Sequence, residues 1–393
     1  MISRFLVAAG LAVLMVLSAV GSYMYLGSRQ STLAAVPKVP TSASPTPGAF
    51  NLPGTLFVTQ GGAIYALSAG RFHQLTAAGG WTQLSVYPGG SLLAVKRNVL
   101  YSDVYVLSRF GRVLKRFTND SAPSGNPDPS ARHWAFYPRM SYNNKLLFLS
   151  YDKPKIGFDV PMSIWAMPLH GNLAQAHLWT VSIDYTGGDM QPLPLPSGGL
   201  MYTKYLYDNN KIVSQIWLSS HPERQYRCGS FCIAPPAGQP DIGKALTTPA
   251  EDCSQPSLSP DHHTIAMICS RQLQLSYLVL ASFNGSTLGP RRYIVINQLV
   301  AQPTWAPDGT GIAYMAPAQL GEGFQLWFLP RLAYAPPTPS PVPTPSSSPT
   351  PGGPVSSPSP SPSPTPAPVV MVKPIQMTNN VGLDATSPMA WIN

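Results

Sequence analysis

One short apolar strand returns six times along this chain. The copies recur roughly every 40–60 residues, and they are Ala63–Leu67, Asp103–Leu107, Ser163–Met167, Gln215–Leu218, Ser276–Leu280 and Phe324–Phe328. Short strands repeating at this period are the sequence signature of a β-propeller, in which each repeat forms one blade. We therefore predict an all-β fold with six blades.

A second motif lies upstream of most of these strands. Its clearest copy runs from Pro303 to Tyr314 and contains Pro-Thr-Trp-Ala-Pro-Asp-Gly. Proline presets φ for a turn and glycine supplies a positive φ, so the motif predicts a strand, a tight turn and a returning strand. Further copies begin at Leu84, Pro138, Pro192 and Pro256.

These two motifs together resemble the Tol-B-type propeller repeat, which reads Pro-x-Trp-Ser-Pro-Asp-Gly, then two strands, then Gln-Leu-Thr. The last element is represented at Gln74–Thr76, Arg116–Thr118, Ala245–Thr247 and Gln376–Thr378. The resemblance covers residues 54–334 and 369–393, and it implies a propeller. Propellers of this kind occur as periplasmic adaptors, as peptidase domains and as surface modules, so the resemblance does not select a function.

The two ends of the repeat region complement each other. After Gln376–Thr378 the chain begins another repeat, with Pro388 and Trp391, whereas the first blade opens at Gly54–Val58 without such a strand. We expect tail residues 387–392 to pair with Thr55–Val58 as the missing strand of blade 1. The ring would then be closed by a C-terminal strand and would have no open edge.

The N-terminal segment is apolar. Residues Phe5–Leu26 carry no charge and follow Arg4. As a helix they would extend about 33 Å, enough to cross a bilayer core. We predict a single-pass transmembrane anchor in a bacterial-type cell membrane, with residues 1–4 in the cytoplasm and the propeller on the extracytoplasmic side. A cleaved signal peptide is the alternative, and the rest of the chain would then be secreted.

Two segments are rich in proline. Residues 27–53 form a Pro/Ser/Thr stalk, and residues 335–368 contain 15 prolines in 34 positions. The second segment cannot bury a core, so we predict a disordered Pro-rich loop inserted in the last blade. Counting strands predicts that the stalk and this loop lie on one face of the propeller. The opposite face would then be free for a partner.

Four cysteines suggest disulfides in an exported chain. Cys253 and Cys269 flank the Pro260-Asp261 turn symmetrically, which predicts a bond across a hairpin. Cys228 and Cys232 would then close a small loop. A zinc site would need a second pair of ligands near Cys228 and Cys232, and the sequence has none there.

Composition and motifs narrow the function only to a class. The net charge is +9, but the basic residues are scattered with no run of five, which favours a solvated basic surface over a nucleic-acid site. No Gly-x-Ser-x-Gly or His-Glu-x-x-His motif occurs, so we predict no catalytic, cofactor or metal residues. The first hypothesis is a non-catalytic binding or scaffold module for a protein, peptide or cell-wall glycan. The second is a hydrolase or lyase with its active site in the propeller channel.

Overall fold

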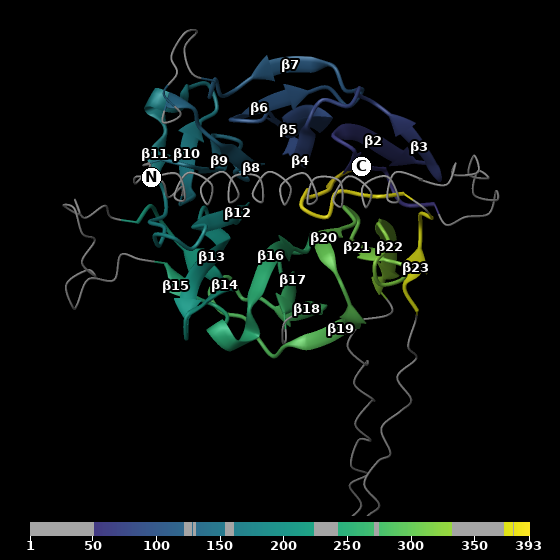
Figure 1. The fold of residues 1–393 in the computed structure, drawn as a ribbon. Coiled ribbons are helices and arrows are strands. Elements are labelled where there is room, and N and C mark those ends of the chain that lie inside the picture. The colour runs from purple at the N-terminus through teal and green to yellow at the C-terminus, as the bar shows by residue number, and fades with distance from the viewer. Residues whose placement is uncertain are drawn as a thin grey trace, which may run out of the picture. The chain divides into compact units, whose positions relative to one another are not determined.

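The computed structural model describes residues 51–121, 128, 131–153, 161–223, 243–270, 275–331, 373–379 and 381–393. Residues from Phe50 onward form one compact unit. It consists of six four-stranded antiparallel sheets set radially around an axis, which confirms the predicted six-bladed propeller (Figure 1). Among the described residues no helix is long and apolar enough to cross a membrane, and the segment Phe5–Leu26 lies outside them.

Each blade is ordered from the axis outward. Blade 1 contains β24 (Ala390–Ile392), β1 (Thr55–Gln60), β2 (Ala63–Ser68) and β3 (Arg71–Gln74). Blade 2 contains β4 (Trp81–Tyr87), β5 (Ser91–Arg97), β6 (Ser102–Leu107) and β7 (Val113–Arg116). Blade 3 contains β8 (Ala135–Met140), β9 (Leu146–Tyr151), β10 (Ser163–Pro168) and β11 (His177–Leu178).

The second half of the ring repeats this order. Blade 4 contains β12 (Asp189–Pro194), β13 (Leu200–Asp208), β14 (Lys211–Ser219) and β15 (Lys244–Ala245). Blade 5 contains β16 (Cys253–Leu258), β17 (Thr264–Ser270), β18 (Ser276–Ser282) and β19 (Arg292–Gln298). Blade 6 contains β20 (Ala301–Trp305), β21 (Gly311–Pro317), β22 (Phe324–Pro330) and β23 (Ile375–Gln376). The short 3-10 helices are η1 (Pro88–Gly90), η3 (Leu173–Gln175) and η4 (Pro249–Glu251).

The six recurring apolar segments all lie in the third strand of their blades. In five blades an amide near the start of the segment donates to a threonine hydroxyl that follows the outer strand. The pairs are Ile64–Thr76, Val104–Thr118, Ile164–Thr180, Ile216–Thr247 and Leu326–Thr378, at 2.8–3.0 Å. The threonine thus satisfies a backbone donor where the short outer strand ends, which gives the Gln-Leu-Thr element its structural role.

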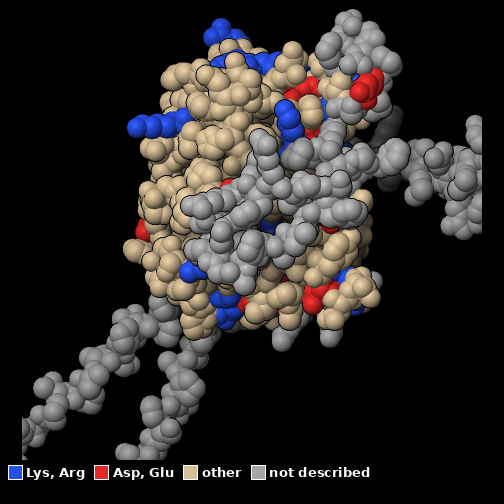
Figure 2. Space-filling view, turned by 90° about the vertical axis from the view of Figure 1, so that its left-hand side faces the viewer, with Lys and Arg blue, Asp and Glu red and all other residues tan. Residues whose placement is uncertain are grey.

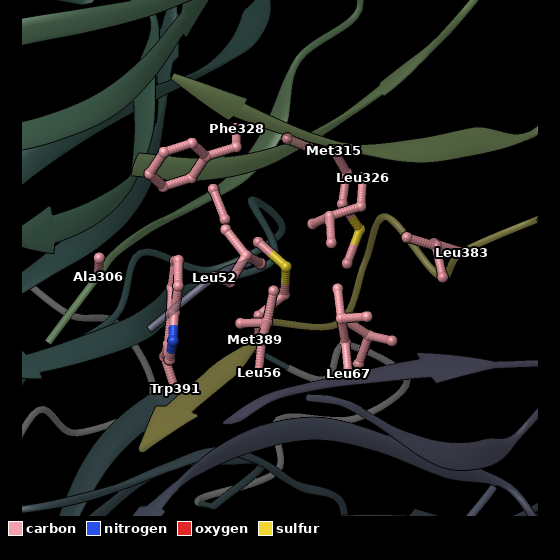
Figure 3. Close-up of a cluster of buried hydrophobic side chains, with 13 residues drawn as sticks. Leu52, Leu56, Leu67, Ala306, Met315, Leu326, Phe328, Leu383, Met389 and Trp391 are labelled. Atoms are coloured by element: carbon pink, nitrogen blue, oxygen red, sulfur yellow. The ribbon is translucent and has the colours of Figure 1, made fainter. Parts of the chain in front are cut away.

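The ring is closed by the chain's last strand. β24 pairs with β1 in the register Thr55–Ile392, Leu56–Trp391 and Phe57–Ala390, as expected from the sequence. The Trp391 indole N–H donates to the Pro53 carbonyl at 2.6 Å. Figure 3 shows Trp391 and Met389 packed among side chains of blades 1 and 6.

The described chain ends near the two Pro-rich segments lie on one face. Pro53 accepts its bond from Trp391 near the end of β24, and the Arg331 amide donates to Thr310 in the turn between β20 and β21. Both contacts lie where the first strand of a blade ends and the second strand begins. We call this the tether face. The segments 27–50 and 335–368 themselves lie outside the described residues.

Blade 5 carries a disulfide. Cys253 on β16 and Cys269 on β17 are directly opposed in the ladder, and their sulfurs are bonded. Cys228 and Cys232 lie outside the described residues.

Buried carboxylates connect blades 2 and 3. Asp120 is only 2% exposed and follows the outer strand of blade 2. Its Oδ1 accepts from the Tyr151 hydroxyl of blade 3 at 2.8 Å, and its amide donates to Asp103 at 2.9 Å. Among the described residues its Oδ2 has no hydrogen-bond partner. Burial raises the pKa of Asp120 to about 6, outweighing hydrogen bonds from Thr118 and Tyr151 that lower it.

Removing the residues after Leu383 should leave β1 as an unpaired inner edge and expose apolar side chains in Figure 3. We expect an insoluble product or a much lower melting temperature, and the milder Trp391→Ala variant should lose about 3–5 kcal/mol. Deletion of Asn393 alone keeps all three paired residues and should melt like the full chain. Equal melting of the Leu383 truncation and the full chain would contradict the role of β24.

The pKa of Asp120 predicts a pH dependence of stability. The folded-state pKa lies above the unfolded value, so the folded protein holds the extra proton, and the free energy of unfolding should fall as pH rises from about 4 to 6. The shift corresponds to about 3 kcal/mol. Urea unfolding of Asp120→Asn should lack this part of the slope. Asp308→Asn, at an exposed turn, should keep it, and parallel curves for Asp120→Asn and the unmodified chain would contradict the prediction.

Candidate functional site

The inner strands share one irregularity halfway along the axis. In blades 2 to 6 the pairing between the first and second strands shifts by a β-bulge. A residue in each bulge has a positive φ of 52–56°, although none is glycine; these are Gln83, Tyr137, Gln191, Gln255 and Gln302. A bulge bends its strand and redirects the side chains that follow it.

The bulge residues join neighbouring blades. Oε1 of Gln83 accepts from the Tyr137 amide at 2.8 Å, Oε1 of Gln191 from the Gln255 amide at 2.9 Å, and Oε1 of Gln255 from the Gln302 amide at 2.6 Å. A side chain of one blade thus satisfies the backbone of the next. Long-range bonds of this kind hold neighbouring blades at a fixed angle and stabilise the ring.

Blade 1 completes this arrangement with its C-terminal residues. Ser387 Oγ accepts from the Gln83 amide at 2.6 Å, and Nε2 of Gln302 donates to the Ala385 carbonyl at 3.0 Å. Between blades 3 and 4, hydrogen bonding links the Tyr137 phenol to Gln191, while burial raises the pKa of Tyr137. We call Gln83, Tyr137, Gln191, Gln255, Gln302 and Ser387 the polar ring.

A cavity of about 220 Å³ opens beside the polar ring. All six blades contribute to its wall, which is rich in proline; Pro192, Pro256, Pro303 and Pro388 are among the lining residues. The lining follows the inner strands from the ring toward the turns between first and second strands. The cavity is therefore on the tether face and not on the opposite face, where the sequence favours a partner site.

Among the described residues that line this cavity, Arg139 is the one that carries a charge. It follows the bulge of β8 by two positions and is half-buried. Among the described residues, no carboxylate forms a hydrogen bond or ion pair with its guanidinium. Burial lowers the pKa of Arg139 to about 10, so the group stays charged at neutral pH. A cation that lines a cavity and lacks a carboxylate partner can bind an anion there.

Tyr142, which lines the cavity, also makes an aromatic contact with another blade. Tyr142, in the turn after β8, meets His262, in the turn after β16, with ring centroids 5.2 Å apart. Blade 4 lies between these two blades, so the contact spans its inner strand. A larger, shallower hollow of about 640 Å³ lies between turns of blades 4 and 5, and His262 is among its lining residues. The smaller cavity is the stronger candidate because it holds the uncompensated charge.

The sequence predicted no chemical site residues apart from the cysteines, and it missed both the polar ring and Arg139. A signal for the ring was present. Gln precedes Pro at 191–192, 255–256 and 302–303, with Tyr137 and Ser387 at the equivalent position before Pro138 and Pro388. Within the described ranges no group of three His, Cys, Asp or Glu side chains could hold a metal ion.

Comparison with known proteins supports the fold. No family model and no curated protein matches the chain. TolB from Acinetobacter baumannii is 14% identical with a TM-score of 0.50, over 72% of this chain and 62% of that one. A protein assigned as TolB from Agrobacterium tumefaciens is 14% identical with a TM-score of 0.47, over 72% and 86%.

A puromycin-hydrolysing peptidase from Mycobacterium tuberculosis is 10% identical with a TM-score of 0.42, over 72% and 45%. This chain therefore spans about three fifths of the Acinetobacter protein and less than half of the peptidase. At such low identity, the similarity shows that this chain shares the β-propeller fold of TolB-like structures.

Proposed function

We propose that this chain is a membrane-anchored, extracytoplasmic propeller of Tol-B-type repeats that acts as a binding or scaffold module. In this proposal a peptide segment of a partner protein enters the axial cavity and places a carboxylate against Arg139. The module recognises its partner and catalyses no reaction. The uncompensated charge of Arg139 in the shared wall of six blades carries the proposal.

The chemistry of the wall supports a peptide ligand. Beside Arg139 the lining offers the amide side chains of Gln191, Gln255 and Gln302, which can donate to and accept from a peptide backbone. The proline and tryptophan residues of the inner strands supply apolar contact area. Because a closed ring of hydrogen bonds holds these groups, little ordering is needed when a ligand binds.

The proposed location rests on the apolar segment Phe5–Leu26. As a membrane helix it would hold the propeller close to the bilayer through residues 27–53. The cavity opens on the tether face, so a partner would reach it from the membrane side or laterally between the blades' turns and the bilayer.

Arg139→Gln should weaken peptide binding. We would screen an array of short peptides that carry Asp or Glu against matched peptides with Asn or Gln, using the full-length protein in detergent. Acidic peptides should bind, and Arg139→Gln should reduce their affinity 10- to 100-fold, because a charged hydrogen bond contributes about 1.5–3 kcal/mol. Arg139→Lys should recover part of the loss.

The control is Arg331→Gln, which removes the same charge at an exposed position on the tether face. It should leave the affinity unchanged. Equal binding of acidic and amide peptides would contradict the proposal, as would an effect of Arg331→Gln as large as that of Arg139→Gln. Binding of acidic oligosaccharides in place of peptides would contradict a peptide ligand and indicate a cell-wall glycan.

Mass spectrometry of protein extracted from membranes should test the proposed anchor. We expect the intact N-terminal peptide, because the apolar segment is longer than that of a typical signal peptide. A mature chain that starts near residue 20–35 would show that the segment is cleaved and that the propeller is secreted.

A further inference from the structure

The outer rim of blades 1 and 2 combines exposed apolar side chains with positive charge. In blade 2 the turn Ser108–Arg112 and strand β7 carry Phe110, Val113 and Leu114, which are 72%, 48% and 48% exposed. In blade 1 strand β3 carries Phe72, which is 36% exposed. Every residue of β3 and β7 is solvent-exposed. We call Arg71–Gln74 and Arg109–Arg116 the basic rim.

The basic rim holds five Lys or Arg residues and no acid; they are Arg71, Arg109, Arg112, Lys115 and Arg116. Arg116 pairs with Asp103 at 2.7 Å, so its charge is compensated. Arg109 lies over the Phe110 ring at 5.1 Å, and Lys115 over the Phe117 ring at 4.2 Å. Such stacking orders the side chains and leaves their charge available.

The two parts of the rim meet. Gly111 has a φ of +82°, and a Cβ placed there would lie 2.5 Å from the carbonyl oxygen of Leu75, just after β3. The blade 2 turn therefore sits directly against the end of the blade 1 outer strand. In Figure 1 β7 lies at the upper edge of the ring, and Figure 2 shows Lys and Arg side chains along that edge above a surface that is mostly uncharged.

Protection of an edge strand explains only part of this pattern. Charged side chains on an outer strand prevent pairing with other chains. That role needs no exposed phenylalanine or leucine, because exposed apolar side chains favour association with other chains. A surface with apolar side chains among cations instead matches the boundary of an anionic bilayer, where apolar groups enter the acyl region and cations meet phosphates.

We propose that the basic rim docks on the anionic phospholipid headgroups of a membrane, with Phe110 inserted between them. The turn Ser108–Arg112 joins a third strand to a fourth strand and therefore lies on the tether face, one blade away from Pro53. This placement beside the membrane rests on the proposed anchor. The chemistry of the rim is independent of the anchor. Docking would hold the propeller at a set angle to the bilayer.

The test is vesicle flotation of the unit Phe50–Asn393, which contains every strand of the ring. Because it lacks the apolar segment, its binding reports on the rim independently of the anchor. We expect binding to vesicles of phosphatidylcholine mixed with phosphatidylglycerol, little binding to phosphatidylcholine alone, and weakening by salt. Arg109→Gln with Arg112→Gln should reduce partitioning roughly tenfold to thirtyfold.

Phe110→Ser should reduce partitioning by a similar factor and leave the salt dependence in place. Lys211→Gln with Lys244→Gln makes the same charge change on exposed positions of blade 4 and should bind like the unmodified unit. No binding to anionic vesicles by a unit with a native circular dichroism spectrum would overturn the proposal. Binding that Phe110→Ser leaves unchanged would also overturn it, because a polyanion site needs no apolar insertion.

Hydrogen–deuterium exchange on the full chain in nanodiscs provides a second measurement if the unit does not fold. Residues 108–112 should be protected in anionic nanodiscs and not in neutral ones. Equal exchange in both would contradict docking, whatever the fate of the N-terminal segment. The Arg139 variants of the cavity should not alter this protection, which separates the rim from the proposed ligand site.

Discussion

The pairing of β24 with β1 is the contact on which the rest of this molecule depends. It joins residues more than 330 positions apart and turns a row of blades into a ring. Only in a closed ring can the polar ring run through all six blades, because Ser387 is its blade 1 member and the Ala385 carbonyl accepts the bond from Gln302. The cavity wall also requires a closed ring, since Met389 and Trp391 form part of this wall. Fold and candidate site therefore share one closing interaction.

Charge has an unusual distribution in this protein. With only 10% charged residues, few ion pairs are available, and backbone ladders, threonine hydroxyls and glutamine amides make most of the specific contacts between elements. Against this background, cations without a carboxylate partner among the described residues are conspicuous. Arg139 in the cavity and the cations of the basic rim other than Arg116 are two such cases, one enclosed and one open, and they suit ligands of different size.

The fold could be predicted from the sequence because its signals are local and repeated. The third strands and the Pro-Asp-Gly turns recur at a regular period, and the missing strand at Gly54 implied the tail that fills it. The site could not be predicted in the same way. A bulge changes which side chains face the axis, and neither Gln191 nor Tyr137 shows from its residue type that it adopts a positive φ. Arg139 therefore had no visible link to the channel, although the Gln-Pro pairs marked the level of the ring.

Closure between segments so far apart in sequence also has a consequence for folding. Until residues 390–392 pair with β1, that strand has no inner neighbour, and the Gln83 amide lacks its Ser387 acceptor. Contacts of such high sequence separation form slowly. A ring that has not yet closed therefore presents an open strand edge, and two copies of the chain can pair with each other through it.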